Sequence, residues 1–324
     1  MLNDNTGYYT DRSVSNSSLS LINPSQMGNP SKFKAYLDGR IETKKKLNLQ
    51  TGSIIHAMVE APDDFAVSEV SLPNDNLMRV YNEYLNIKDT YFELSLDELL
   101  IKASRLAKFY NNRKDESLLK ALNESSLKDY ISEMESLNGK HIVTKEQKEI
   151  ILSCIKSLQS HEGCYTKLFQ VEDNAICYKE LEIFWECEEL DENGEPIKCK
   201  AKLDVLKEFP DERRLELIDL KTGQKSAQFF KESFDFWRYG RQLSYYKSAL
   251  LSLEKYKGWK LDTFMPVVST TDFTRHCYSI PNHYLMEGED EWRALLKRIS
   301  FHKKNNEWNY TMEECLSGNY IISL

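Results

Sequence analysis

Three ionisable residues in the second half of the chain have the types and the spacing of a metal-assisted hydrolytic site. Asp204 ends an alternating run, KCKAKLD, and Asp219 follows fifteen residues later with Lys221 two positions beyond it. Alternate residues of a strand share a face, so the spacing predicts that Asp219 and Lys221 point to the same side of one strand. Two neighbouring strands would then bring two carboxylates and one ammonium together among apolar residues.

A divalent cation would explain why these charges stand in apolar surroundings, where unpaired charges are expensive. Carboxylate oxygens suit Mg²⁺ or Mn²⁺, and both ions also bind phosphate oxygens. Such an ion polarises a phosphate and lowers the pKa of a bound water, while Lys221 could orient or help to deprotonate that water and offset transition-state charge. On spacing alone, a surface salt bridge between Asp219 and Lys221 explains the pattern about equally well.

Strands and helices that would position these residues follow from periodicity and turn signals. Residues 178–187 and 196–209 are typical of strands joined by a DENGE hairpin, and 213–223, 263–271 and 275–281 indicate three more. Helical patterns fill 226–256 and 289–305. We therefore expect an α/β fold with a central mixed β-sheet flanked by helices and a helical N-terminal part.

The N-terminal half is predicted to be mostly helical. Residues 1–14 are polar and expected to be flexible, and 15–40 favour two short helices separated by a loop rich in Pro, Gly and Asn. A helix that contains His56 should end near Pro62, and residues 74–168 are mostly helical in pattern. We expect one domain over 15–324, with its catalytic core at 175–300.

Composition sets broad limits on the class of protein. The chain has 324 residues, 41% hydrophobic and 29% charged, as in ordinary globular proteins, and no apolar run approaches the length of a membrane span. The N-terminus has no signal-peptide pattern and no two of the seven cysteines form a CxxC pair, so we expect a cytoplasmic protein with reduced thiols. A net charge of −8 argues against coating nucleic acid over the whole surface, although it permits a local basic channel.

Further residues extend the acidic pair into an ordered pattern. Gln242 and Tyr246 form a QxxxY on the next helical segment, Gly52 and His56 form a GxxxH, and Glu180 lies in ELEIFW. Together with SNSSLSLI and PSKFKAYLDG, this order resembles the PD-(D/E)XK nuclease superfamily, in particular its RecB-like, lambda-exonuclease-like and exonuclease VIII (RecE-type) members. The resemblance runs from about Ser15 to the end of the chain. Leu203 stands where the motif's name leads one to expect proline.

The resemblance implies a role for each matching residue. The implied metal ligands are Asp204, Asp219, the Leu220 carbonyl and His56, and Lys221 takes the place of the catalytic lysine. Gln242 and Tyr246 would hold the DNA backbone or the catalytic carboxylates, because i and i+4 share a helix face. Glu180 matches a position near the metal centre, and Glu182, two residues along the same strand, is the alternative.

An activity also follows from the resemblance. It implies a Mg²⁺- or Mn²⁺-dependent exodeoxyribonuclease that digests linear double-stranded DNA from its ends, 5′ to 3′, as a homo-oligomeric ring of phage or prophage type. The product strands would serve a single-strand annealing protein or recombinase. An endonuclease, a single-strand exonuclease and a catalytically silent DNA-binding scaffold of the same fold remain alternatives.

Two surface features have two interpretations each. Lysines at 44–46 and at 198, 200 and 202 either contact phosphates or form a solvated face. Aromatic residues between 229 and 239 are expected to pack mainly between helices, and one ring near the site could act on DNA as a wedge.

Overall fold

The computed structural model describes residues 7–40, 47–60, 65–67, 73–110, 112–136, 141–143 and 145–318. Its described residues divide into two compact units, one within residues 62–150 and the other within residues 4–61 and 151–324. Each unit is described by itself.

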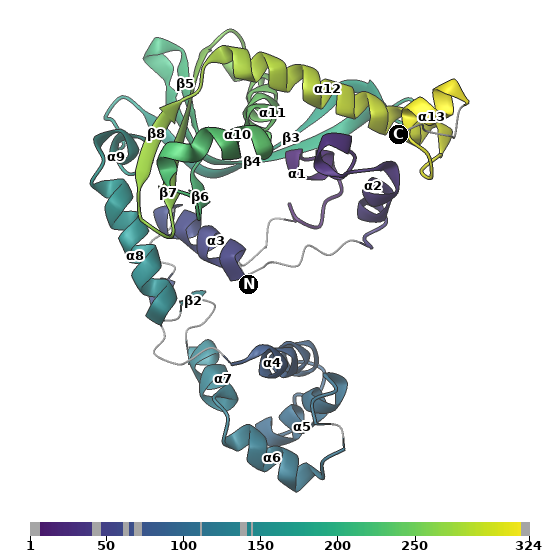
Figure 1. The fold of residues 1–324 in the computed structure, drawn as a ribbon, viewed down its shortest axis with the longest axis vertical. Helices are drawn as coiled ribbons and strands as arrows, with labels where there is room; N and C mark the ends of the chain where they lie inside the picture. Colours follow the sequence, from purple (N-terminus) through teal and green to yellow (C-terminus); the bar gives the residue numbers. More distant parts are fainter. Residues whose placement is uncertain are drawn as a thin grey trace. The chain divides into compact units, whose positions relative to one another are not determined.

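A six-stranded mixed sheet forms the centre of the larger unit (Figure 1). Its order is β3-β4-β5-β7-β6, with β8 paired to β7. Pairing is antiparallel between β3, β4 and β5 and between β7 and β8, and parallel between β7 and both β5 and β6. The α/β fold with a mixed sheet and flanking helices is confirmed. The strands are β3 (Ile176–Leu190), β4 (Pro196–Phe209), β5 (Arg214–Ile218), β6 (Lys221–Gly223), β7 (Lys260–Ser269) and β8 (Arg275–Ser279).

The strand expected over 213–223 is interrupted at Asp219 and Leu220. Ile218 pairs with Phe264 and Lys221 with Val267, so β5 and β6 keep one register along the same edge of β7. The backbone N–H of Asp219 still donates to the Phe264 carbonyl at 3.0 Å, but that of Leu220 donates to the Asp204 carboxylate instead. The interruption therefore arises because a side chain of β4 takes a main-chain donor from the ladder.

Helices cover the apolar face of this sheet. Leu203 and Leu206 of β4 pack in one core with Phe230, Phe234 and Leu243. The helical elements on this side are η4 (Ala227–Phe229), α10 (Phe230–Phe236), α11 (Tyr239–Leu251), η5 (Glu254–Tyr256) and α12 (Asn282–Asn305).

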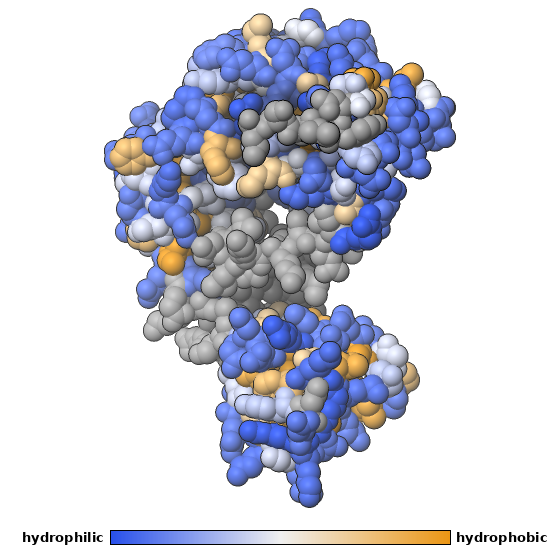
Figure 2. Space-filling model, turned by 45° about the vertical axis from the view of Figure 1, so that its right-hand side comes forward, coloured by the Kyte–Doolittle hydropathy of each residue, from blue (hydrophilic) through white to orange (hydrophobic). Residues whose placement is uncertain are grey.

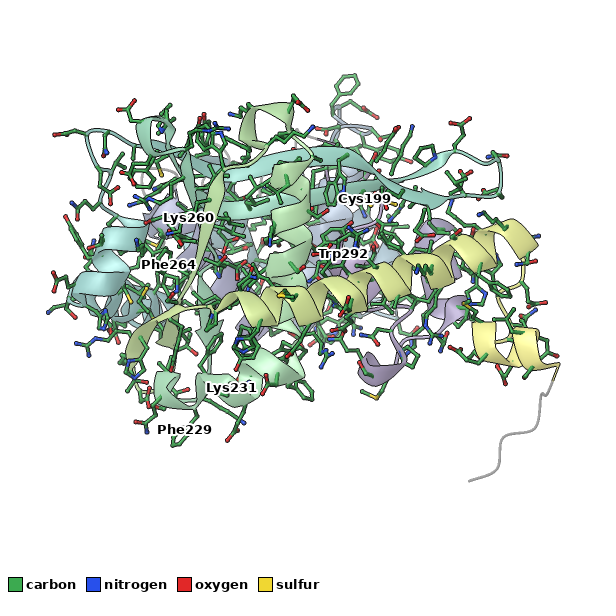
Figure 3. The ribbon with its side chains drawn as sticks, turned by 90° about the horizontal axis from the view of Figure 1, so that it is seen from above. Cys199, Phe229, Lys231, Lys260, Phe264 and Trp292 are labelled. Carbon is green, nitrogen blue, oxygen red and sulfur yellow. The ribbon has the colours of Figure 1, made fainter. Side chains whose placement is uncertain are left out.

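Helices α11 and α12 cross closely because glycines stand at the crossing. A Cβ added to Gly288 would lie 2.4 Å from the Gly240 carbonyl oxygen, which no side chain tolerates. Beside this crossing, the indole of Trp292 on α12 donates to the Ser244 hydroxyl of α11 at 3.2 Å, and Figure 3 shows Trp292 between the two helices. The start of α11, next to the predicted site, is thereby fixed.

The N-terminal segment packs on the hairpin. The elements are α1 (Asn16–Leu19), with a capping box from Ser15, η1 (Pro24–Gln26) and α2 (Pro30–Leu37). Val14 exchanges main-chain hydrogen bonds with Lys198 and Lys200 of β4, so the segment is joined to this strand at Val14. Residues 1–6 lie outside the described part. Helix α3 (Leu47–Glu60) follows and ends two residues before Pro62, close to the predicted boundary.

The smaller unit is mostly helical. Leu100, Leu118 and Leu127 are fully buried in its core. Its elements are β1 (Phe65–Val67), α4 (Asp75–Ile87), α5 (Leu96–Leu106), α6 (Asp115–Asn123), α7 (Leu127–Ser136) and β2 (His141–Val143), with β1 and β2 in parallel pairing. After it come α8 (Lys145–Gln159) and α9 (Glu162–Leu168).

The remaining short elements are η3 (Pro210–Glu212) and α13 (Met312–Ser317). In the described part of the chain, every helix is too short or too polar to cross a bilayer. Hydrophilic residues dominate the face shown in Figure 2, and hydrophobic ones occur on it in small groups.

Candidate active site

Asp204 links three elements through one carboxylate oxygen. Its Oδ2 accepts the hydrogen bond from Leu220 N at 2.9 Å and lies 3.3 Å from Nδ1 of His56 on α3. Gly52 allows α3 to come this close, since a Cβ there would lie 2.6 Å from the Thr222 hydroxyl of β6. The GxxxH spacing thus has a physical reason: the glycine permits the approach, and the histidine one turn later shares its helix face.

Asp219 lies deeper, with only 1% of its surface exposed. The side-chain amide of Gln242 donates to its Oδ1 at 3.1 Å and also lies 2.9 Å from the hydroxyl of Tyr246. Oδ2 is buried and accepts no hydrogen bond from the described residues, although the ammonium of Lys221 lies beside it as an ion-pair partner. Oδ2 of Asp219 therefore contacts a cation, the ammonium of Lys221, and no neutral hydrogen-bond donor among the described residues.

Burial and neighbouring charges act differently on the two carboxyl groups. Burial raises the pKa of Asp219 to about 6, helped by the charge of Asp204 and opposed by that of Lys221. For Asp204 burial acts in the same direction, but His56, Lys221 and the hydrogen bond from Leu220 outweigh it and lower the pKa. Burial opposes the charge of Lys221, yet the carboxylates of Asp219 and Asp204 raise its pKa above the ordinary value. Lys221 is therefore a firmly held cation.

Tyr239 is a further site residue, although its sequence context predicts only a packing aromatic. The ammonium of Lys221 lies 4.7 Å from the centre of its ring, within the range of a cation–π contact. Its relation to the QxxxY could have revealed it, because Tyr239, Gln242 and Tyr246 stand at i, i+3 and i+7 of one helix. All three therefore share one face of α11.

Glu180 and Glu182 approach Lys202 rather than the two aspartates. Glu180 forms an ion pair with Lys202, and Glu182 lies 4.0 Å from the same ammonium. Glu180 also has a left-handed backbone, with φ of 54°, inside a strand. Such a conformation costs about 1–3 kcal/mol and often marks functional sites. The assignment of Glu180, or of Glu182 in its place, to the metal centre stays a prediction.

Two of the lysines considered for phosphate binding have other partners. Lys200 is 4% exposed, and its ammonium donates to the main-chain carbonyls of Tyr8 and, at 2.8 Å, Asp11. Lys200 therefore anchors the N-terminal segment, and that part of the phosphate interpretation is wrong. Lys202 is neutralised by glutamates, Lys198 is exposed, and residues 44–46 lie outside the described residues.

The donor atoms fit a divalent cation in type. Two carboxylates and a main-chain carbonyl are oxygen ligands of the kind that suits Mg²⁺ and Mn²⁺, whereas the imidazole of His56 is a softer nitrogen ligand that transition metals prefer. Asp219 Oδ2 is contacted by the Lys221 ammonium and by no neutral donor of the described residues, which is consistent with an atom that binds cations. Within the described ranges, however, no three His, Cys, Asp or Glu side chains are already gathered at metal-binding distances.

Comparison with known proteins decides the family. The model of the PD-(D/E)XK nuclease superfamily matches residues 28–300, which include His56, Asp204, Asp219 and Lys221. The chain belongs to this superfamily. No curated protein matches the chain. As a member of the PD-(D/E)XK superfamily it is a nuclease by family, and the resemblance drawn from its motifs is confirmed.

Solved structures support the fold. A crystal structure of a protein from Eubacterium rectale, described as a "putative exonuclease", is 13% identical and covers 99% of this chain and 93% of its own, with a TM-score of 0.51. The crystal structure of SSO0001 is 14% identical over 75% of this chain and 84% of its own, with a TM-score of 0.24, too low to support an argument.

Proposed function

We propose that this superfamily member is a Mg²⁺- or Mn²⁺-dependent exodeoxyribonuclease that digests linear double-stranded DNA from its ends, 5′ to 3′, in the cytoplasm. The observation that carries the proposal is the convergence of Asp204, Asp219, Lys221 and His56 from three separate segments at one end of β5. The exonucleolytic action, the duplex substrate and the polarity rest on the resemblance of the motifs to exonuclease VIII.

The proposed metal ligands are Asp204, Asp219, the Leu220 carbonyl and His56. When bound there, a divalent cation would supply Lewis-acid polarisation of the phosphate and lower the pKa of a coordinated water. A cation also favours the ionised form of Asp219, whose pKa burial raises to about 6. Metal binding and ionisation of Asp219 should therefore support each other.

Lys221 acts as a cation in this proposal. Because the neighbouring carboxylates raise its pKa, its ammonium stays protonated and suits the stabilisation of negative charge on the phosphorane-like transition state. Its contact with the Tyr239 ring holds the ammonium on one side while Asp219 holds it on the other. In this geometry it can orient a water by donating to it.

Gln242 and Tyr246 position Asp219. The amide of Gln242 contacts both Asp219 Oδ1 and the Tyr246 hydroxyl, so the QxxxY fixes the carboxylate from the helix side. We assign these two residues as positioning residues. Glu180, or Glu182 in its place, is assigned to the edge of the centre, where Lys202 now neutralises it.

The test is digestion of linear duplex DNA, labelled separately at its 5′ and 3′ ends, beside covalently closed circles, with Mg²⁺, Mn²⁺ or EDTA. We expect metal-dependent loss of the linear substrate from its 5′ ends and survival of the circles. Cutting of circles would instead identify an endonuclease, digestion of single strands alone a single-strand exonuclease, and no cutting with either metal a silent scaffold.

Assembly and partners complete the proposal. A homo-oligomeric ring with an acidic exterior and a basic lumen would reconcile the net charge of −8 with a DNA substrate. The single strands produced would pass to an annealing protein or recombinase. Light scattering of the purified protein tests the ring, and a monomer at micromolar concentration would exclude it.

A further inference from the structure

The aromatic residues before and at the start of α11 fall into a buried and an exposed set. Phe230 and Phe234 belong to the core, and the ring of Tyr239 stacks on Phe230 with centroids 5.7 Å apart. The expectation of helix packing is therefore right for these rings. The exposed set consists of Phe229 (53% exposed), Phe236 (68%) and Trp237 (54%).

Phe236 and Trp237 form a ring pair on a well-held turn between α10 and α11. Their centroids lie 4.8 Å apart with the planes at 89°. Trp237 N donates to the Ser233 carbonyl at 2.9 Å, and Arg238 takes a left-handed backbone, with φ of 59°, while its guanidinium pairs with Glu291 of α12 at 2.7 Å. Exposed rings on a fixed backbone lose little conformational entropy on binding, which favours recognition.

This ring pair lies close to the candidate active site. Trp237 is two residues before Tyr239, whose ring contacts the Lys221 ammonium at 4.7 Å. Two residues span at most about 7 Å between their Cα atoms. The backbone that carries Trp237 therefore lies beside the backbone of Tyr239, so a strand whose phosphate reaches Lys221 passes Trp237 within a few nucleotides.

The cations of the same segment already have anionic partners. Lys231 pairs with Asp235 on α10, Lys225 pairs with Glu232, and Arg238 pairs with Glu291. Figure 3 shows Phe229 and Lys231 at the outer edge of the unit. The groups of this turn that remain for a ligand are chiefly the exposed rings of Phe236 and Trp237. Their faces suit a flat apolar group better than a phosphate.

We infer that Phe236 and Trp237 form a stacking platform for an unpaired nucleobase of the substrate, within a few nucleotides of the phosphate that is cut. The inference rests on the proposed function and names how that site holds its strand. Base–aromatic stacking tolerates any sequence, because every base has a π-face. Stacking on these rings would fix the position of the strand end, so that the phosphate to be cut lies beside Lys221 and the proposed metal ligands.

The first experiment measures DNA affinity by fluorescence anisotropy, with a duplex that carries a short single-stranded end and in the D219N background so that the substrate survives. We expect Trp237→Ala to weaken binding about 5- to 100-fold and Trp237→Phe to restore most of it. Phe229→Ala is the matched control, because it removes an equally exposed ring from the same segment. Equal affinities of the Trp237→Ala and Phe229→Ala variants would overturn the inference.

The second experiment locates the base. Single abasic sites at each of the first four nucleotides remove one stacking partner at a time. We expect one position to weaken binding to the platform-intact protein, and the same position to have no further effect on the Trp237→Ala variant. A flat profile in both proteins would overturn the platform, as would a change in oligomeric state on Trp237→Ala, which would mark a protein interface.

Cleavage by the wild-type protein, measured in parallel, separates this inference from the proposed function. A protein that cuts linear DNA but shows a flat abasic profile keeps its function and loses the platform. A wild-type protein that neither binds nor cuts DNA loses both.

Discussion

Two clusters of buried charge lie on β4 and are satisfied in different ways. At its end, the ammonium of Lys207 donates to the carbonyls of Thr166 (2.6 Å) and Gln170 (2.7 Å) and to Glu172 (2.9 Å), and Glu208 accepts from Tyr256 at 2.8 Å. A few residues earlier, Asp204 faces Asp219, whose Oδ2 accepts no hydrogen bond from the described residues. A buried charge whose hydrogen bonds are all made to protein groups is structural, whereas a buried carboxylate oxygen that only an ion pair holds is suited to a metal ligand.

The largest effect should come from Asp219→Asn. The change keeps size and the contact with Gln242 but removes the charge that a divalent cation requires, so cleavage should fall by about three orders of magnitude or more. DNA binding, measured by anisotropy, should be nearly unchanged. Cleavage within tenfold of wild type would show that Asp219 is not part of the site.

Lys207→Met should instead destabilise the protein without a specific effect on catalysis. It leaves two main-chain carbonyls and Glu172 without their donor, at about 2–4 kcal/mol of unfolding free energy. Urea denaturation measures the loss, and the rate per folded molecule should stay at the wild-type value. A fully active variant of unchanged stability would remove the distinction between the two clusters.

Divalent cations should stabilise the wild-type protein through the cluster of Asp204 and Asp219. At a hundred times its dissociation constant, Mg²⁺ or Mn²⁺ adds about 2.7 kcal/mol, seen as a higher midpoint of thermal unfolding. The increase should persist in Lys207→Met and disappear in Asp219→Asn. An equal increase in both variants would place the metal elsewhere.

The smallest effect should come from Glu208→Gln, whose cost in unfolding free energy should depend on pH. Burial opposes its charge, but the hydroxyls of Tyr256 and Tyr178 and the ammonium of Lys255 lower its pKa below the ordinary 4.5. Its ionised form therefore stabilises the fold above about pH 4.5, and this contribution is lost as the pH falls through the lowered pKa. Glu208→Gln should cost about 1–2 kcal/mol at pH 7 and progressively less in acid, as measured by urea denaturation at pH 7, 5 and 3. A difference that does not change with pH would mean that the charge of Glu208 contributes nothing.

Much of the fold could be predicted because it depends on local patterns. The hairpin of β3 and β4, the strands β7 and β8 and the helix of His56 follow from alternation, turn residues and helical spacing. The break between β5 and β6 could not be predicted, since Leu220 leaves the ladder for a carboxylate sixteen residues away in the chain. Lys200 was misassigned for the same kind of reason, because its carbonyl partners belong to Tyr8 and Asp11.

Residue types and spacing indicated the acidic pair and its lysine, and the resemblance to known nucleases added the QxxxY, the glycine–histidine pair and the superfamily. These features are local, so period two in strands and period 3.6 in helices is enough to reveal them. Three-dimensional packing decided that Asp219 is buried with one oxygen held by Lys221 alone, that Tyr239 touches Lys221, and that Phe236 and Trp237 are exposed while Phe230 and Phe234 are not. Burial and hydrogen-bond partners depend on contacts between residues far apart in the chain, and no local pattern encodes them.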